Sequence, residues 1–326
     1  MNCTQRPRRL RTTATLRALV RETELHPSHL VLPLFVQDGT GIDVKVDGLP
    51  MVHILSVDMI APYLEPLLER GLSSVLVFGK IDPKHKTTCG THAMVPDGIV
   101  PRSIRFLRAT YPNLVVMTDV ALDPYTTHGH DGIVVNGHVV NDATVDLLSR
   151  MALMHAEAGA HVVAPSDMMD GRVASIRSLL DEHRHVDTAV MSYTAKYASC
   201  LYGPFRTILD SAPLFGDKRA YQMDPSNVRE AERELMLDLD EGADIVMVKP
   251  AMWYLDVIHR LSVMSDRPIA AYHVSGEASM ILDGSARGMF DFHTAVLEAT
   301  TAIRRAGADI IVTYFAETLL EKGLIR

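Results

Sequence analysis

The sequence contains little cysteine and no apolar run long enough to cross a membrane. Its 326 residues include three widely spaced cysteines, Cys3, Cys89 and Cys200, and an odd number of scattered thiols excludes a disulfide framework. Such cysteine usage is typical of a reducing compartment, so we expect a cytoplasmic protein. No stretch approaches the roughly 18 uninterrupted apolar residues of a transmembrane helix, and the basic N-terminus lacks the apolar segment of a secretory signal. We therefore expect no membrane partner.

The sequence also has no excess of positive charge and no phosphate-binding glycine motif after its first apolar run. The formal net charge of −8 at pH 7 disfavours nucleic acid as the main partner. Because no G-x-G-x-x-G follows residues 30–36, a doubly wound open sheet is disfavoured, although it is the competing topology. The hydrophobic content of 47%, against 22% charged residues, fits a globular protein with a large core.

Short runs of apolar, mostly β-branched residues alternate with helix-length amphipathic stretches. Three of these runs repeat the order of a helix end, a glycine and a strand, so Gly159, Gly242 and Gly307 are expected as left-handed helix caps. Eight buried strands that alternate with helices predict an α/β fold of the (β/α)8 TIM-barrel class. The predicted strands are 30–36, 74–79, 114–120, 161–167, 189–194, 244–250, 269–276 and 309–315.

The chain divides into a short N-terminal arm and one large domain. Residues 1–28 precede the first predicted strand and contain six arginines. We expect them to form an arm that contacts another subunit, with a frayed basic tail as the alternative. Residues 29–326 then form a single barrel domain, a fold that routinely runs to about 250 residues or more. Two connections, 80–100 and 197–225, are longer than a barrel requires, and long βα loops commonly carry function or act as lids.

Two lysines stand at predicted strand ends, Lys196 in MSYTAKYASCLYGPFR and Lys249 in DIVMVKPAMWYLD. Burial there disfavours the charged ammonium form, so we expect the pKa of each lysine to fall. A neutral amine near pH 7 can attack a ketone and form a Schiff base, as in class I aldolases. Two such lysines suggest an enzyme that holds two carbonyl substrates covalently. The alternative is that each lysine extends to solvent at the barrel mouth or pairs with a carboxylate.

Further polar residues follow other predicted strands. Because the carboxyl ends of parallel barrel strands open on one face, Asp119, Asp167, Ser275 and Tyr314 are expected to meet the two lysines there. Singly, each of these has an ordinary structural explanation, such as capping a strand. The 197–225 connection adds cationic and amide groups that suit a carboxylate substrate, namely Arg206, Lys218 and Gln222.

The segment DVALDPYTTHGHDG, residues 119–132, combines three aspartates with two histidines. Because it contains no cysteine, a tetrahedral thiolate zinc site is excluded here. The carboxylates of Asp123 and Asp131 would prefer a hard cation such as Mg²⁺, or no metal at all. The alternative is a polar loop whose side chains satisfy one another by hydrogen bonds.

Taken together, these segments resemble the porphobilinogen synthase family, also called 5-aminolevulinate dehydratase. The resemblance covers nearly the whole chain and rests on TDVALDPYTTHGHDG, APSDMMDGR, YTAKYASCLYGPFR, YQMDPSN, EGADIVMVKPAMWYLD and VSGE. It implies a TIM barrel with an N-terminal arm, assembled as a homo-octamer of arm-exchanging dimers. It also implies a lyase of tetrapyrrole and haem biosynthesis, which condenses two 5-aminolevulinate molecules to porphobilinogen with loss of two waters.

The resemblance also implies a role for each candidate side chain. Lys249 is similar to the lysine that forms a Schiff base with the propionate-side substrate, and Lys196 to the lysine that engages the acetate-side substrate. Asp119 is similar to an acid that orients an amine or moves protons. The implied carboxylate-binding residues are Ser275 and Tyr314 on the propionate side, and Arg206, Lys218 and Gln222 on the acetate side.

The sequence departs from the zinc-dependent branch of this family. Where that branch has three cysteines that bind a catalytic zinc, this chain has Ala121, Asp123 and Asp131, so the resemblance implies no catalytic zinc. It implies Mg²⁺ or a monovalent cation such as K⁺, or no active-site metal. Glu234 is similar to a glutamate that anchors a stimulatory, allosteric Mg²⁺ away from the chemistry, and an ordinary exposed glutamate is the alternative.

Some positions and two other functions stay open at this stage. Lys218 precedes Arg219 where the family usually has arginine first, and since lysine binds a carboxylate as a point charge, either residue could take that role. His273 stands where the family more often has glutamine, and Cys89 and His92 have no assigned role. The other functions are a class I aldolase or dehydratase acting on another keto acid through one lysine, and a catalytically silent barrel that serves in binding or assembly. The presence of both lysines disfavours these two.

Overall fold

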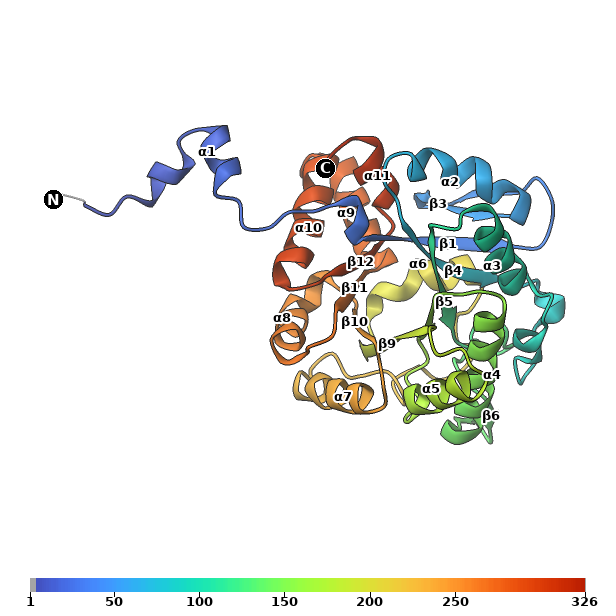
Figure 1. The fold of residues 1–326 in the computed structure, drawn as a ribbon. Helices are drawn as coiled ribbons and strands as arrows, with labels where there is room; N and C mark the ends of the chain where they lie inside the picture. Colours follow the sequence, from blue (N-terminus) through green and yellow to red (C-terminus); the bar gives the residue numbers. More distant parts are fainter. Residues whose placement is uncertain (1–3, 326) are drawn as a thin grey trace.

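The central feature of the structure, a computed structural model that describes residues 4–325, is a closed barrel of parallel strands; Cys3 lies outside the described residues. The barrel strands are β1 (Leu30–Gln37), β4 (Ser74–Lys80), β5 (Val115–Val120), β8 (Val162–Pro165), β9 (Ala189–Lys196), β10 (Ile245–Lys249), β11 (Ile269–His273) and β12 (Ile310–Thr313). Each strand pairs with the next, and β12 pairs with β1 through Leu30 with Ile311 and Val31 with Val312. This closure confirms the predicted TIM barrel and excludes the open sheet (Figure 1).

Helices surround the barrel because each buries an apolar stripe against the strands. The i, i+4 spacing of Ala231, Leu235 and Leu239 predicts one apolar stripe on α7 (Arg229–Asp240), and the structure fully buries the first two but only partly buries Leu239. The glycines predicted as caps all have positive φ, at +106° for Gly159, +98° for Gly242 and +123° for Gly307. The other barrel helices are α2 (Ile60–Leu68), α3 (Ile99–Thr110), α4 (Asn141–Glu157), α5 (Arg172–Glu182), α8 (Leu255–Met264), α9 (Ser275–Ala286), α10 (Phe292–Ala306) and α11 (Ala316–Glu321).

Two short hairpins were not predicted. Strands β2 (Asp43–Val46) and β3 (Leu49–Leu55) pair in antiparallel fashion, and β3 also runs parallel to the end of β1. The signal for this turn was the Asp47-Gly48 dipeptide, which is typical of tight hairpins, and Gly48 has a φ of +75°. The second hairpin joins β6 (Val134–Val135) to β7 (His138–Val139). Short 3₁₀ helices are η1 (Pro7–Arg11), η2 (Pro27–His29), η3 (Val57–Met59), η4 (Pro83–His85), η5 (Thr91–Met94), η6 (Cys200–Tyr202) and η7 (Met252–Tyr254).

Aromatic side chains fill the barrel interior beneath its carboxyl-terminal mouth. Phe35 and Phe78 stack with ring centroids 5.2 Å apart, and the rings of Tyr193 and Tyr272 lie 6.4 Å apart. All four side chains are buried. Because this packed layer closes the barrel from below, a site at the mouth has an apolar, water-excluding floor.

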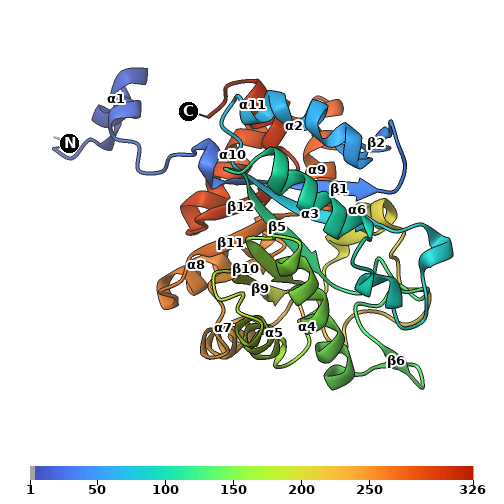
Figure 2. The ribbon, with the colours of Figure 1, turned by 45° about the vertical axis from the view of Figure 1, so that its right-hand side comes forward.

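The N-terminal segment extends away from the barrel. Residues 4–24, which include α1 (Ala14–Leu19), contain no buried residue and project from one side in both views (Figures 1 and 2). Leu25 is the first buried residue along the described chain, just before β1 begins. Residues 4–24 thus form an extended segment outside the barrel, whose first strand begins at Leu30. Among residues 4–325, no helix is both long and apolar enough to cross a membrane.

Candidate active site

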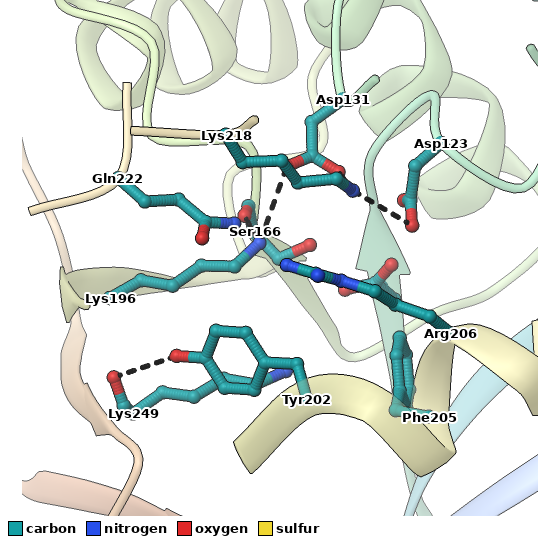
Figure 3. Close-up of a pocket in the computed structure, with 11 residues that line it drawn as sticks. Asp123, Asp131, Ser166, Lys196, Tyr202, Phe205, Arg206, Lys218, Gln222 and Lys249 are labelled. Carbon is teal, nitrogen blue, oxygen red and sulfur yellow. Dashed lines mark hydrogen bonds and ion pairs between the residues drawn. The ribbon is translucent and has the colours of Figure 1, made fainter. Parts of the chain in front are cut away.

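A polar pocket lies at the carboxyl ends of β5, β8, β9 and β10, and residues from 202 to 222 form its outer wall (Figure 3). We call residues 197–225, which include α6 (Gly203–Leu209), the lid segment. The pocket holds a dense set of charged groups that come from separate elements of the barrel. Its lining residues are Asp119, Asp123, Asp131, Ser166, Lys196, Tyr202, Phe205, Arg206, Lys218, Gln222 and Lys249.

Lys249, the last residue of β10, ends in an aromatic surrounding. Its side chain is buried, and its Nζ atom lies 4.1 Å from the ring centroid of Tyr272 and 4.9 Å from that of Phe205. The rings of Tyr193 and Tyr202 follow at 5.1 and 5.4 Å, and we call these four rings the aromatic cage. Burial, followed by the nearby Lys196 ammonium, lowers the pKa of Lys249 to about 7. A substantial fraction of this amine is therefore neutral near pH 7, as a nucleophile requires.

Lys196, the last residue of β9, has polar neighbours instead. Its ammonium donates a hydrogen bond to the carbonyl oxygen of Ser166 and lies 3.7 Å from a carboxylate oxygen of Asp131. The ring of Tyr193 is near both lysines, with its centroid 5.9 Å from Lys196 Nζ and 5.1 Å from Lys249 Nζ. The pocket thus has an aromatic half around Lys249 and a charged half around Lys196.

Lys218 is buried and pairs with two of the three aspartates in residues 119–132, Asp123 and Asp131. Its Nζ atom lies 3.0 Å from Asp131 Oδ1 and 3.6 Å from Asp123 Oδ2. Burial alone would raise the pKa of Asp131, but the ammonium groups of Lys196 and Lys218 outweigh it and hold that pKa below its usual range. For Asp123, burial outweighs the lysine and the pKa is raised. Since both carboxylates face an ammonium group, these contacts disfavour their predicted role as metal ligands.

Asp119, in β5, lines the pocket but, unlike Asp123 and Asp131, forms no ion pair with a lysine among the described residues. Its Oδ1 atom is buried with no hydrogen-bond partner there. Burial, and then the neighbouring Asp123 carboxylate, raise the pKa of Asp119 to about 7. A carboxyl group with a pKa near neutrality can both give and take a proton at physiological pH.

The lid segment is anchored to the loops around it. Lys86 Nζ donates to the carbonyl oxygens of Leu209 and Asp210 (3.3 and 2.5 Å), at the end of α6. The Leu214 N–H donates to the His128 carbonyl oxygen (3.0 Å). A Cβ atom on Gly129, whose φ is +71°, would collide with the carbonyl oxygen of Ala212, so this close approach requires glycine. The long connections 80–100 and 197–225 therefore meet beside the pocket.

Most of the predicted site residues meet, but three do not line the pocket. The Ser275 hydroxyl accepts a hydrogen bond from the Phe205 N–H (3.0 Å), and the Tyr314 hydroxyl lies 3.3 Å from that of Tyr272. Both therefore lie behind the aromatic cage, on the Lys249 side. The expectation for Asp167 was wrong, because its side chain turns away from the pocket: Oδ1 accepts from the Met169 N–H (2.7 Å) and Oδ2 faces Arg172.

The positions left open by the sequence are now located. Lys218 lines the pocket, whereas Arg219 is exposed and pairs with Asp217 at 3.8 Å. His273 is fully buried and contacts the Thr313 hydroxyl (3.2 Å), away from the lysines. Cys89 and His92 lie on the 80–100 loop, where His92 stacks on His85 with ring centroids 4.5 Å apart.

Glu234 lies on α7 in a separate surface pocket that also includes Asp170, Glu230 and Arg219. Burial raises the pKa of Glu234 to about 7. Across residues 4–325, no cluster of three or more His, Cys, Asp or Glu side chains has an arrangement that could hold a metal ion.

Sequence reasoning missed the aromatic cage and Ser166. Tyr202 and Phe205 lie next to Arg206 in the lid segment, and their place over Lys249 depends on how that segment folds back. Tyr193 precedes Lys196 by three residues on β9, and regular alternation would place these two side chains on opposite faces of the strand. The pairing of β9 with β10 is irregular between these positions, which the sequence does not show. Ser166 directly follows β8 and accepts the hydrogen bond from Lys196 through its backbone carbonyl. Because every residue type has this group, the sequence does not indicate the contact.

Comparison with known proteins gives one consistent result. The family described as Delta-aminolevulinic acid dehydratase matches residues 4–322. Proteins of that name from Chlamydia pneumoniae and Methanothermobacter thermautotrophicus are 48% and 51% identical, over 98% and 97% of this chain and 97% of each relative. The crystal structure of the Toxoplasma gondii delta-aminolevulinic acid dehydratase (porphobilinogen synthase), in complex with the reaction product porphobilinogen, superimposes with a TM-score of 0.96. Its sequence is 43% identical, and the match covers 98% of this chain and 92% of that one.

Proposed function

The chain belongs to the delta-aminolevulinic acid dehydratase family, and from this premise we propose how its residues divide the reaction. The enzyme is a lyase of tetrapyrrole biosynthesis, which converts two molecules of 5-aminolevulinate into porphobilinogen with loss of two waters. The observation that carries the assignment is the pair of buried lysines, Lys196 and Lys249, at the ends of adjacent strands in one pocket.

We assign the propionate-side substrate to Lys249. Its neutral amine attacks the keto carbon to give a carbinolamine, whose hydroxyl takes up a proton and leaves as water. The product is an iminium ion that acidifies the adjacent carbon. The pKa of about 7 supports the attack, and the aromatic cage supports the cation that forms, because ring faces attract cationic groups. Ser275 and Tyr314 are proposed to hold this substrate's carboxylate, since their buried hydroxyls contact two members of the cage.

We assign the acetate-side substrate to Lys196. Arg206, Lys218 and Gln222 line the same half of the pocket and supply cationic and amide groups for its carboxylate. Two substrates held side by side react as if within one molecule, an effect that can contribute roughly 7–11 kcal/mol. Asp119 has a buried oxygen without a partner among the described residues and a pKa near neutrality, so we propose that it moves protons between the two substrates.

The ion requirement is proposed to lie outside the pocket. Enzymes of this family are metal-dependent. Asp123 and Asp131 both pair with Lys218, which fits a counterion role better than a shared Mg²⁺ or K⁺ site. Glu234 lines a surface pocket on α7, and Mg²⁺ commonly binds through one or two carboxylates while it keeps several waters, so we propose Glu234 as the anchor of an allosteric Mg²⁺. No catalytic zinc is part of this proposal.

The assembly and its location complete the proposal. Residues 1–28 are proposed to form an arm that contacts a neighbouring subunit in a homo-octamer, and residues 29–326 the catalytic barrel domain. The absence of buried residues within 4–24 supports such a role, because Leu10 and Leu19 are left 52% and 79% exposed in the single chain. The scattered cysteines support a cytoplasmic location.

Turnover of 5-aminolevulinate by the purified chain tests the function directly. The pyrrole product is measured by its colour reaction, in the presence and absence of Mg²⁺. The proposal requires that two substrate molecules are consumed for each pyrrole product formed. Consumption without a pyrrole product would favour the aldolase alternative, in which one lysine acts alone.

A further inference from the structure

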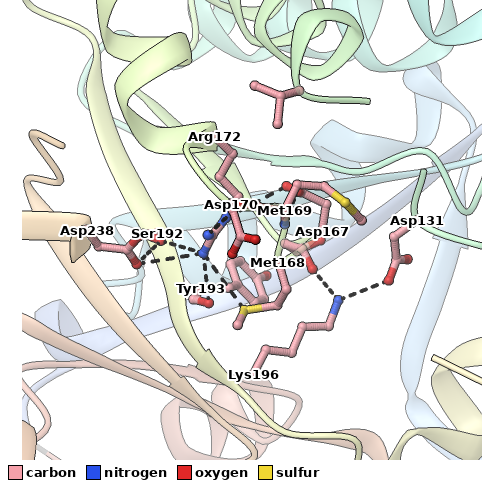
Figure 4. A network of polar contacts seen from close by, with 12 residues as sticks. Asp131, Asp167, Met168, Met169, Asp170, Arg172, Ser192, Tyr193, Lys196 and Asp238 are labelled. Carbon is pink, nitrogen blue, oxygen red and sulfur yellow. Dashed lines mark hydrogen bonds and ion pairs between the residues drawn. The ribbon is translucent and has the colours of Figure 1, made fainter. Parts of the chain in front are cut away.

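A buried polar network lies directly behind the charged half of the pocket (Figure 4). Its centre is Arg172, the first residue of α5, whose side chain is 3% exposed. The guanidinium donates hydrogen bonds to the Met169 carbonyl oxygen (3.1 Å), the Ser192 hydroxyl (2.9 Å) and the Tyr193 carbonyl oxygen (3.2 Å). None of these atoms touches the pocket, so the reaction as proposed leaves this network unexplained.

The network joins three separate elements. Through Met169 it holds the turn 166–171 that follows β8, and through Ser192 and Tyr193 it holds β9. It also reaches α7, because Arg172 Nη2 lies 3.7 Å from Asp238 Oδ2, which in turn accepts a hydrogen bond from the Ser192 hydroxyl (2.6 Å). One guanidinium therefore connects a loop, a barrel strand and an outer helix.

The turn held by Arg172 has a strained backbone. Met168 has a φ of +69°, a conformation that non-glycine residues rarely adopt. Such strain persists only where the surroundings over-determine it, and it is concentrated at functional sites. Here Asp167 Oδ1 accepts from the Met169 N–H (2.7 Å) while Arg172 binds the Met169 carbonyl, so the peptide group that follows Met168 and the next one along the chain are both fixed.

Lys196 donates a hydrogen bond to the Ser166 carbonyl oxygen, and both partners belong to elements that Arg172 binds. The strained turn begins at Ser166, whose carbonyl oxygen accepts the hydrogen bond from the Lys196 ammonium, and β9 ends at Lys196 itself. We propose that Arg172 is a positioning residue, which by tying the 166–171 turn and strand β9 to Asp238 fixes the Lys196 amine in its direction of attack. This inference rests on the proposed role of Lys196.

The charged groups of the network indicate that it orients Lys196 rather than only stabilising the fold. Two buried carboxylates, Asp167 and Asp238, face one guanidinium, and buried ion pairs are often no more stabilising than apolar groups of the same volume. The Asp167 Oδ2 and Arg172 Nε atoms lie 3.9 Å apart, and neither has a hydrogen-bond partner among the described residues. What arginine adds here is a rigid planar group with several donors in fixed directions, which lysine does not have.

The test measures imine formation at the two lysines separately within the same chain. The full-length enzyme is mixed with 5-aminolevulinate and reduced with borohydride, and the adducts on the Lys196 and Lys249 peptides are quantified by mass spectrometry. The variants are Arg172→Lys, which keeps the charge but not the planar fork, and Ser192→Ala, which removes the hydroxyl that bridges Arg172 and Asp238 but leaves their direct ion pair. Ser149→Ala is the matched control, a buried serine on α4 that bonds Val145 and Ser175.

The expected result is a loss at Lys196 alone. Because a misplacement near 1 Å can cost roughly 100-fold in rate, we expect the Lys196 to Lys249 adduct ratio to fall by about 10-fold or more in Arg172→Lys and Ser192→Ala. Ser149→Ala should leave the ratio unchanged. If Arg172→Lys does not fold, the ratio of Lys196 to Lys249 adducts in Ser192→Ala tests the inference instead.

Two results would overturn the inference. An unchanged ratio in a folded variant would show that the network does not orient Lys196, and a parallel fall at both lysines would show a general structural role. If the enzyme without any substitution gave no adduct on Lys249, that result would contradict the proposed function instead. Failure of the inference and failure of the proposed function are therefore distinguishable.

Discussion

Lys249 of β10 and Lys196 of β9 are direct register partners on adjacent parallel strands. Because paired residues on neighbouring strands point to the same face, both amines enter the pocket at one level of the barrel. Their surroundings nevertheless differ, with aromatic rings around Lys249 and a carbonyl and carboxylates around Lys196. Under the proposed assignment of one substrate to each lysine, this asymmetry distinguishes two identical substrate molecules, which an asymmetric condensation requires.

Replacing Lys249 by methionine should abolish turnover. Methionine is also long and largely apolar, so the aromatic cage can keep its packing while the nucleophile is lost. We expect kcat to fall by roughly 10³-fold or more, as removal of a covalent catalyst typically does. Steady-state kinetics measures the loss, and circular dichroism shows whether the barrel is folded. A folded Lys249→Met enzyme with most of its activity would disprove the Schiff-base assignment.

Replacing Lys196 by methionine should also stop condensation, but at a later stage. The Lys249 amine and its aromatic cage lie in the other half of the pocket, so the first imine should still form. Borohydride reduction should therefore give an adduct on Lys249 while no pyrrole accumulates. Normal pyrrole formation by this variant would mean that one covalent site is sufficient.

The pH dependence should reflect the lowered pKa of Lys249. Since burial lowers that pKa from 10.5 to about 7, the rate of adduct formation should rise between about pH 6 and 8 rather than above pH 9. Asp119 has a pKa of about 7 in the same pocket, so the apparent value belongs to the coupled set. A rise that begins only near the pKa of a free lysine would contradict the burial argument.

The same shift has a consequence for stability. Between about pH 7 and 10.5 the unfolded chain keeps a proton on Lys249 that the folded chain has lost. The unfolded state then binds more protons, so the contribution of this group to the free energy of unfolding rises with pH across that window. In Lys249→Met this contribution is absent, and the difference between the two unfolding curves measured against pH isolates it.

Gly129→Ala should weaken substrate binding by displacing the lid segment. A Cβ at this position would meet the Ala212 carbonyl oxygen, and the backbone has a φ of +71°. Gly137→Ala is the control, because its φ is +79° but nothing lies within 4 Å of the added atom. Both substitutions carry a backbone strain of roughly 1–2 kcal/mol. Only Gly129→Ala should raise KM, by about 10-fold. Equal KM values for the two variants would show that the position of the lid segment does not affect substrate binding.

Glu234→Ala should remove the response to Mg²⁺ while leaving basal turnover intact. Glu234 lies in a surface pocket on α7, outside the set of residues that lines the lysine pocket. Glu232→Ala is the control on the same helix, since Glu232 pairs with Arg260 instead. Activity is measured across a Mg²⁺ titration for both variants. An unchanged titration curve for Glu234→Ala would place the ion elsewhere.

The barrel was predictable because its strands are buried on both faces. Such strands are near-continuous apolar runs, and Lys196 and Lys249 are conspicuous as charged residues at their ends. β2 was missed because its residues face solvent, with Val44 52% exposed, so no apolar run marks it. The side-chain direction of Asp167 was not predictable, since it lies beyond the end of β8 and depends on the Met168 backbone.

The aromatic cage shows where sequence reasoning ended. Tyr193 and Tyr272 come from barrel strands, but Tyr202 and Phe205 come from the lid segment and reach Lys249 only in the folded chain. Similarly, Asp123 and Asp131 are plausible metal ligands by residue type. Only the position of Lys218, which lies 87 residues after Asp131, shows that an ammonium group faces them.

The most direct test of the account is borohydride reduction of the purified enzyme with 5-aminolevulinate, followed by mass spectrometry of its peptides. The account predicts a reduced adduct on Lys249, together with or followed by one on Lys196. A folded enzyme that forms pyrrole without an adduct on either lysine would contradict it.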